Sequence, residues 1–207
     1  MAQHSTFPSD LPVPEDDGAC SHLPGKSLPP ISLSSTSGSS TAISILSGLV
    51  IFFCYPRTGA PGETVPDNWN AIPGARGCTP QACSFRDAAD ELLELGVSYI
   101  FGVSTQNTEY QREAKERLHL PYQLLSDEAL ELQEGLGLPT FEWEGKKVLK
   151  RVTLAVVDGK IEKVWYPVFP PDKSADQVLQ WLKTEWKGRT GTSTDAESDM
   201  QRNFQKR

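Results

Sequence analysis

The sequence is poor in the residues that build disulfide scaffolds and metal sites. Only four cysteines and three histidines occur among 207 residues. Small secreted domains that depend on disulfides carry far more cysteine than this. Cys78 and Cys83 lie close together, but His4, His22 and His119 are scattered, and a structural zinc site needs four ligands. We therefore expect neither a disulfide scaffold nor a metal site.

The chain also lacks a long apolar run and an excess of positive charge. Its most apolar stretch, residues 43–55, is interrupted by Ser44, Ser47 and Gly48 and is too short to span a bilayer. The first residues show neither a basic segment followed by an apolar one nor an arginine-rich, acid-free presequence. Without these patterns we expect a cytoplasmic protein. The net charge of −7 and the lack of a basic cluster lead us to expect no nucleic-acid or membrane partner.

What the sequence does contain is a cysteine at an expected helix start. Residues 73–87 read Pro-Gly-Ala-Arg-Gly-Cys-Thr-Pro-Gln-Ala-Cys-Ser-Phe-Arg-Asp. We expect Thr79 to cap a helix in which Pro80 takes the first position. The free N–H groups of a helix N-terminus stabilise negative charge, and Arg76 adds positive charge nearby. Because the thiolate is the reactive form of cysteine, Cys78 is a candidate nucleophile rather than an inert structural cysteine.

The predicted elements alternate between strands and helices. Apolar runs predict buried strands over 49–55 and 97–104, and a stripe from Phe85 to Leu93 predicts a helix between them. The first of the other expected elements is a hairpin turning near Gly38, preferred to a flexible linker over 34–41. The later ones are a helix over 105–118 capped by Asn107 or Thr108, a strand over 121–126, a helix over 128–136 capped by Asp127, strands over 147–157 and 160–166 joined by Asp158-Gly159, and a helix over 175–186 capped by Ser174. This order predicts an α/β sandwich with a mixed sheet.

Composition divides the rest of the chain. Residues 56–77 form a loop longer than is usual in a compact domain, and we expect a functional segment anchored by Trp69 and Ile72 rather than a passive surface insertion. We divide the chain into an extended or disordered arm over 1–19, one domain over 20–187 and a disordered tail over 188–207.

Several other side chains have ordinary structural interpretations. Cys54 lies in an apolar strand and is expected to pack in the core, whereas Cys20 is expected on the mobile arm. Arg151, taken by itself, reads as an exposed charge at the edge of a strand. Trp165 and Tyr166 read as packing residues.

The segment from Gly77 to Asp87 resembles the active-site segment of peroxiredoxins of the Q type, also called bacterioferritin comigratory proteins. Three further stretches match the family in the same order: 53–57 before the cysteine, 124–127 after it, and 151–153 with 158–160 further on. The resemblance covers roughly residues 20–186. It implies a thioredoxin-like fold with a mixed central sheet flanked by helices, here with an N-terminal β-hairpin.

The same resemblance implies the thiol-dependent reduction of hydrogen peroxide and organic hydroperoxides. It assigns Cys78 as the peroxidatic cysteine, Cys83 as the resolving cysteine and Arg151 as the arginine that orients thiolate and peroxide. It further implies a Cys78–Cys83 disulfide that thioredoxin reduces, and this chemistry needs no cofactor and no metal. We expect a monomer or weak homodimer. The other function classes are a thioredoxin-like disulfide reductase, whose usual Cys-x-x-Cys spacing is absent here, and a peroxide-sensing redox relay.

The chain departs from the family pattern Pro-x-x-x-Thr/Ser-x-x-Cys. Ala71 and Ala75 stand where the proline and the hydroxyl residue belong, seven and three residues before Cys78. Pro56 and Thr58 lie where the pattern should begin, separated from the cysteine by an insertion. We take them as the displaced proline and hydroxyl.

Helix geometry adds a conformational expectation. Residues five apart in a continuous helix lie about 7.5 Å apart along the axis and point roughly 140° apart. A disulfide needs Cα atoms within roughly 4.4–6.8 Å and converging Cβ atoms. We therefore expect residues 79–85 to be helical while Cys78 and Cys83 are reduced, and to unwind when the two cysteines pair.

Overall fold

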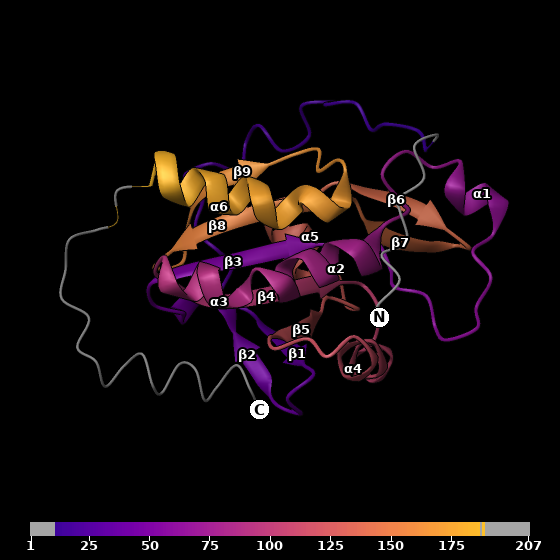
Figure 1. Cartoon of the computed structure of the whole chain (residues 1–207), viewed down its shortest axis with the longest axis horizontal. Coiled ribbons are helices and arrows are strands. Elements are labelled where there is room, and N and C mark those ends of the chain that lie inside the picture. The colour runs from indigo at the N-terminus through magenta and orange to yellow at the C-terminus, as the bar shows by residue number, and fades with distance from the viewer. Residues whose placement is uncertain (1–10, 187, 189–207) are drawn as a thin grey trace.

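The centre of the protein is a seven-stranded mixed sheet (Figure 1). The computed structural model describes residues 11–186 and 188. The strand order is β2-β1-β5-β4-β3-β8-β9, in which β3, β4 and β5 are parallel and β1, β8 and β9 join in antiparallel pairs. The strands are β1 Ser32–Ser35, β2 Ser40–Ala42, β3 Leu49–Cys54, β4 Val97–Ser104, β5 Gln123–Ser126, β8 Val152–Val157 and β9 Lys160–Trp165. The predicted mixed sheet and N-terminal hairpin are confirmed.

A second, two-stranded sheet was not predicted. It pairs β6 Thr140–Trp143 with β7 Lys146–Leu149 in an antiparallel hairpin. The turn uses Glu144 and Gly145, whose φ angles are 49° and 74°. The single strand expected over 147–157 is therefore wrong: β7 ends at Leu149 and β8 begins at Val152. The two strands belong to different sheets, so the chain must change direction between them.

Six α-helices are present among the described residues. They are α1 Asp67–Asn70, α2 Cys78–Asp87, α3 Ala89–Glu94, α4 Thr108–Arg117, α5 Glu131–Leu136 and α6 Ser174–Thr184, with short 3₁₀ helices at Ile43–Ile45 and Pro171–Lys173. The helix expected through Leu93 is interrupted at Ala88, which separates α2 from α3.

Helix starts differ from the predictions where side chains redirect the chain. Asn107, one of the two expected caps, caps α4 by accepting a hydrogen bond from the Tyr110 amide, and the helix therefore begins at Thr108 rather than at residue 105. Asp127 accepts from the amides of Leu132 and Gln133, as a capping carboxylate should, but α5 begins only at Glu131. Ser174 is the first residue of α6 and makes no capping hydrogen bond, so its predicted capping role is wrong.

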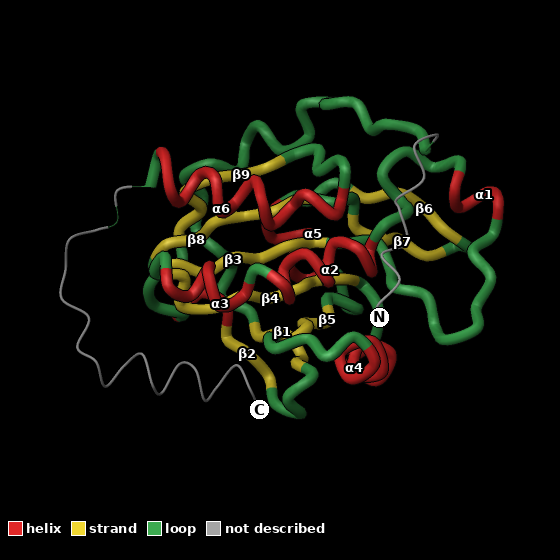
Figure 2. The backbone as a smooth tube through the Cα atoms, in the orientation of Figure 1, coloured by secondary structure: helices red, strands yellow, loops and turns green. Residues whose placement is uncertain are grey.

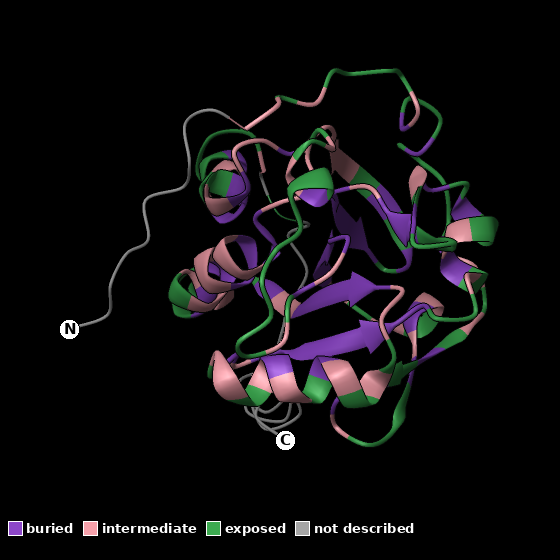
Figure 3. Ribbon diagram, turned by 90° about the vertical axis from the view of Figure 1, so that its right-hand side faces the viewer, coloured by how far each residue is buried: buried purple, intermediate pink, exposed green. Residues whose placement is uncertain are grey.

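The sheet separates two apolar layers, because successive residues of a strand point to opposite faces. Leu49, Ile51 and Phe53 of β3 pack with α2, α3 and α6. The intervening residues, among them Phe52 and Cys54, pack on the other face with α5 and the N-terminal segment. Figure 3 shows buried central strands between these layers.

The N-terminal segment before β1 packs on the second face of the sheet and is drawn as loop in Figure 2. The Gly25 amide donates to the Ile161 carbonyl, and the Leu28 amide donates to the Gly159 carbonyl, both at 2.8 Å. Cys20 is buried in this layer, so its expected place on a mobile arm is wrong. The described part of the predicted arm, residues 11–19, contains neither helix nor strand. Residues 1–10 and, except for Gly188, the predicted tail lie outside the described residues.

Strand register brings two distant segments to one edge of the sheet. β3 pairs antiparallel with β8, and Cys54 at the end of β3 faces Val152 at the start of β8. The residues after Cys54 and the residue before Val152 therefore meet. That preceding residue is Arg151, and the loop after β3 leads to Cys78.

Candidate active site

The candidate site is built at the first residue of α2. Gly77 takes a left-handed conformation with φ of 108°, which side chains rarely adopt, and α2 begins directly after it at Cys78. The Gln81 amide donates to the Gly77 carbonyl at 3.0 Å and closes the first turn. The predicted cap at Thr79 and first position for Pro80 are therefore wrong, because the glycine starts the helix earlier. Cys78 is buried, with 4% exposure.

Arg151 lies against the sulfur of Cys78. Its Nη2 is 3.4 Å from the Cys78 Sγ, and its side chain is 3% exposed. The carbonyls of Gly74, Ala75 and Arg76 accept from the same nitrogen at 3.2–3.3 Å. Arg151 is therefore no exposed edge charge. It is a buried guanidinium that the loop before α2 holds beside the thiol.

Gln81 fixes the other end of the guanidinium. Its Oε1 accepts a hydrogen bond from Arg151 Nη1, and its Nε2 donates to the Ser174 hydroxyl at 3.2 Å. The Ser174 and Thr153 hydroxyls are 3.1 Å apart. All four side chains are buried, so they form a polar chain that joins α2, β8 and α6 beneath the thiol.

Sequence reasoning missed Gln81 and Ser174 as parts of the site. One signal was present: Gln81 lies three residues after Cys78, on the same face of the helix. A long polar side chain on a buried helix face needs a hydrogen-bond partner. The identity of that partner depends on the approach of α6, which no local pattern predicts.

Pro56 and Thr58, which we take as the displaced proline and hydroxyl, are both buried near the end of β3. The Thr58 hydroxyl and amide both donate to Oε1 of Gln106, and the Gln106 side-chain amide donates to the Thr58 carbonyl. The hydroxyl of Thr58 is thus engaged with Gln106. At Cys78 the thiol instead donates to the Ala75 carbonyl, with the sulfur 3.6 Å from the oxygen.

The insertion before Cys78 is fixed to the hairpin. Trp69 of α1 packs edge-on against Trp143 of β6, with ring centroids 4.8 Å apart. Trp69 and Ala75 share a buried cluster with Trp143 and Val148, and Ile72 packs against it, which confirms the predicted anchors. The carbonyls that hold Arg151 therefore belong to a well-supported loop.

Arg76, expected to supply charge near Cys78, instead bonds within this loop. Its Nη1 donates to the Asn70 side chain at 3.0 Å. The guanidinium in contact with the sulfur comes from Arg151, a residue distant in sequence. This is why neighbours along the chain did not predict the charge of the site.

Cys83 lies on α2 and is half-buried, and neither Cys78 nor Cys83 is in a disulfide. Residues 79–85 are helical, as expected for the reduced state. Burial raises the pKa of the Cys83 thiol, and the charges of Arg86 and Arg117 oppose this shift only in part. Cys83 is therefore a thiol rather than a thiolate at neutral pH.

The two remaining cysteines lie across the sheet from Cys78. Cys20 and Cys54 belong to the apolar layer on the second face, whereas Cys78 belongs to the first. Burial raises the pKa of Cys20 to about 12 and raises that of Cys54 still further. Cys54 packs in the core, as predicted, and neither thiol is poised to ionise at neutral pH.

Comparison with known proteins identifies the family to which the chain belongs. The redoxin family model matches residues 23–179. Peroxiredoxin Bcp of Escherichia coli K12 is 33% identical over 138 residues, which cover 65% of this chain and 78% of the relative. The chain is a peroxiredoxin of the Q/Bcp type.

Two further relatives agree with this peroxiredoxin assignment. A chloroplastic peroxiredoxin Q of Suaeda salsa is 28% identical over 160 residues, covering 76% of this chain and 67% of the relative. The crystal structure of peroxidoxin BcpB from Mycobacterium tuberculosis superposes with a TM-score of 0.64 at 28% identity, covering 80% of this chain and 99% of that one. The predicted thioredoxin-like fold is confirmed.

Membership of this family implies thiol peroxidase activity, a peroxide substrate and a thiol reductant. No helix among residues 11–186 is long and apolar enough to cross a membrane. The same part of the chain holds no cluster of three or more potential metal ligands.

Proposed function

We propose that this peroxiredoxin reduces hydrogen peroxide and organic hydroperoxides through a sulfenic acid on Cys78, which Cys83 resolves as an intramolecular disulfide. Thioredoxin then reduces the disulfide, and the cytoplasm is the expected compartment. The observation that carries the proposal is the contact between Arg151 Nη2 and Cys78 Sγ at the first residue of α2.

The peroxide step needs a thiolate next to groups that bind oxygen. The amides of the first turn of α2 and the Arg151 guanidinium both favour negative charge on the sulfur. The sulfur attacks one peroxide oxygen, an S–O bond forms, and the O–O bond breaks. The leaving oxygen departs as hydroxide or alkoxide and takes up a proton, and Cys78 becomes a sulfenic acid.

Arg151 has one N–H donor that is free to bind the peroxide in this step. Its Nε is buried and has no hydrogen-bond partner among the described residues. A buried N–H without an acceptor carries a desolvation cost of about 1–3 kcal/mol. A peroxide oxygen beside the sulfur is a suitable acceptor. We assign to this N–H the hydrogen bond that the hydroxyl of the family pattern would otherwise supply.

Resolution joins the Cys83 thiol to the oxidised Cys78. The Cys83 sulfur attacks the sulfenic sulfur, water leaves, and an S–S bond forms. A dithiol protein then returns both cysteines to thiols by exchange, and is itself oxidised. Burial of Cys54 and Cys20 on the opposite face supports Cys83 as the resolving residue.

The test is peroxide consumption coupled to thioredoxin. We expect turnover by the wild type, none by Cys78→Ser, and nearly unchanged turnover by Cys20→Ala and Cys54→Ala. The last two are matched controls, because they remove thiols across the sheet. Appreciable turnover by Cys78→Ser would overturn the assignment. Turnover with another thiol reductant but not with thioredoxin would overturn only the choice of reductant.

A further inference from the structure

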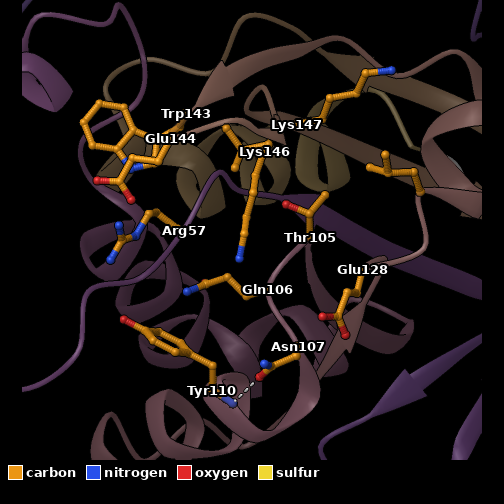
Figure 4. Close-up of a pocket in the computed structure, with 12 residues that line it drawn as sticks. Arg57, Thr105, Gln106, Asn107, Tyr110, Glu128, Trp143, Glu144, Lys146 and Lys147 are labelled. Atoms are coloured by element: carbon orange, nitrogen blue, oxygen red, sulfur yellow. Dashed lines mark hydrogen bonds between the residues drawn. The ribbon is translucent and has the colours of Figure 1, made fainter.

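A cavity of about 480 Å³ lies beside the candidate active site (Figure 4). It opens between the start of α4 and the β6–β7 hairpin. This volume is within the range of small-molecule sites, about 300–1,000 Å³. None of Cys78, Arg151 and Thr58 lines it, so it is distinct from the peroxide site.

The cavity presents an unpaired positive charge. Figure 4 shows the Lys146 side chain extending into it, toward Gln106, with Arg57 on one side. No ion pair or hydrogen bond joins the Lys146 ammonium to another residue in the described part of the chain. Arg57 forms an ion pair with Glu63, which does not line the cavity.

Charged side chains of both signs line the cavity. The three cationic side chains Arg57, Lys146 and Lys147 are opposed by Glu128 and Glu144. Lys147 points away from the centre in Figure 4, whereas Lys146 points into it. Lys146 is therefore the charge that favours an anion at the centre of the cavity.

One wall of the cavity is apolar and carries a buried donor. Trp143, Val148 and Leu130 line it, and Trp143 is only 8% exposed. The indole Nε1 of Trp143 has no hydrogen-bond partner among the described residues. Buried polar groups are normally paired, and Trp143 lines the cavity, so a ligand in the cavity is a candidate acceptor for this N–H.

The walls are also held in place without a ligand. Trp69 packs edge-on against Trp143 from behind, and Gln106 is fixed by hydrogen bonds to Thr58. Asn107 caps α4 at the floor. A cavity with fixed walls loses little conformational entropy when a ligand enters.

We propose that this cavity binds a small organic carboxylate with an apolar body. The carboxylate lies between Lys146 and Arg57, and the apolar body lies on Trp143, Val148 and Leu130. This assignment goes beyond the peroxidase activity and does not depend on it, since no catalytic group lines the cavity.

Calorimetric titration of the reduced protein with three eight-carbon probes tests the charge preference. We expect octanoate to bind at one saturable site, octan-1-ol at least about tenfold more weakly, and octylammonium more weakly still. Absence of saturable octanoate binding would overturn the proposal. Equal binding of octan-1-ol, or tighter binding of octylammonium, would overturn it as well.

Variants locate the site. Lys146→Gln should weaken octanoate binding at least about fivefold and leave octan-1-ol unchanged, because only the anion uses the ammonium. Lys160→Gln is the matched control, since it removes an exposed lysine on β9 outside the cavity. The indole N–H resonance of Trp143, identified by its loss in Trp143→Phe, should shift with octanoate. Equal octanoate affinity in both lysine variants, or an unmoved Trp143 resonance, would refute the location.

Discussion

Gln81 accepts a hydrogen bond from Arg151, and both side chains are buried beneath the first turn of α2. One glutamine thus couples the helix that carries Cys78 to the guanidinium that contacts the Cys78 sulfur. The loop carbonyls of residues 74–76 hold the same guanidinium from the other side. The position of Arg151 therefore depends on both the loop and the helix being folded.

The first prediction concerns Gln81 as a positioning residue. Gln81→Met removes the acceptor for Arg151 and keeps similar volume. Hydrogen bonds to charged groups contribute about 1.5–3 kcal/mol, so we expect the rate constant for peroxide reduction to fall roughly 10- to 100-fold. The measurement is single-turnover oxidation of Cys78.

A purely structural role for Gln81 would give a different result. Gln81→Glu keeps the acceptor oxygens and should recover most of the rate, whereas Ser174→Ala, one step further along the polar chain, should have a smaller effect. If Gln81→Met lowers thermal stability but leaves the oxidation rate unchanged, the positioning role is excluded.

The second prediction concerns the charge and shape of Arg151. Arg151→Met removes the donor that contacts the Cys78 sulfur, so the oxidation of Cys78 by peroxide should slow at least about tenfold in a single turnover. Arg151→Lys keeps the charge but lacks the planar fork that the loop carbonyls and Gln81 occupy together. It should therefore restore the rate only in part. An unchanged oxidation rate in Arg151→Met would show that this guanidinium does not act at the sulfur.

Much of the fold could be predicted, because it follows from local patterns. The apolar runs of β3 and β4 and the Asp158-Gly159 turn are each encoded within a few residues. A helix start close to Cys78 was predictable for the same reason, since Gly77, Thr79 and Pro80 lie beside it in the sequence. Tertiary contacts decided the rest. The chain leaves strand geometry at Lys150 because β7 belongs to the second sheet and β8 to the first. The residue pattern within 147–157 does not predict this change of sheet.

The same distinction holds within the site. The local sequence around Arg151 predicts an exposed charge at a strand edge. Only the family resemblance predicted that this arginine lies beside the thiol. Its burial follows from the β3–β8 register, a contact between segments about one hundred residues apart. Gln106, whose side chain bonds to Thr58, follows the end of β4. No pattern in the sequence around Gln106 predicts this contact.

The third prediction is a pH dependence in the N-terminal segment. Hydrogen bonds from Lys150, Tyr166 and the Ala19 amide lower the pKa of Asp17 to about 2, from an ordinary value of 3.8. A lowered folded-state pKa means that the contribution to stability is present above about pH 4 and is lost as the pH falls through about 2. The Ala19 amide resonance should therefore titrate with a midpoint near 2.

Asp17→Asn is the control for this titration, because it cannot ionise. Its Ala19 resonance should stay constant across the same range. A wild-type midpoint near 3.8 would mean that Asp17 is not held by Lys150 and Tyr166 in solution. Since Lys150 precedes Arg151, the peroxide rate should be recorded in Asp17→Asn as well, and we expect it to change less than twofold.

The last prediction is that α2 must unwind before Cys78 and Cys83 can pair. The two residues lie in one continuous helix, five positions apart, which is incompatible with disulfide geometry. Unwinding the first turns breaks the hydrogen bonds of Gln81 to Arg151 and Ser174. It also strains the bond from the Tyr122 hydroxyl to the Ala82 carbonyl, which is 2.6 Å long. Formation of the Cys78–Cys83 disulfide therefore requires several buried hydrogen bonds to break or distort.

Two measurements separate this mechanism from its alternatives. Peptide mapping without reductant, after one equivalent of peroxide, should find Cys78 joined to Cys83, and amide exchange over residues 79–86 should be faster in the oxidised protein. Tyr122→Phe removes one restraint on α2 and should speed disulfide formation without changing the preceding peroxide step, because Tyr122 does not hold Arg151. A bond from Cys78 to Cys54, Cys20 or a second subunit would refute the resolving role of Cys83, and unchanged exchange in the oxidised protein would refute the unwinding.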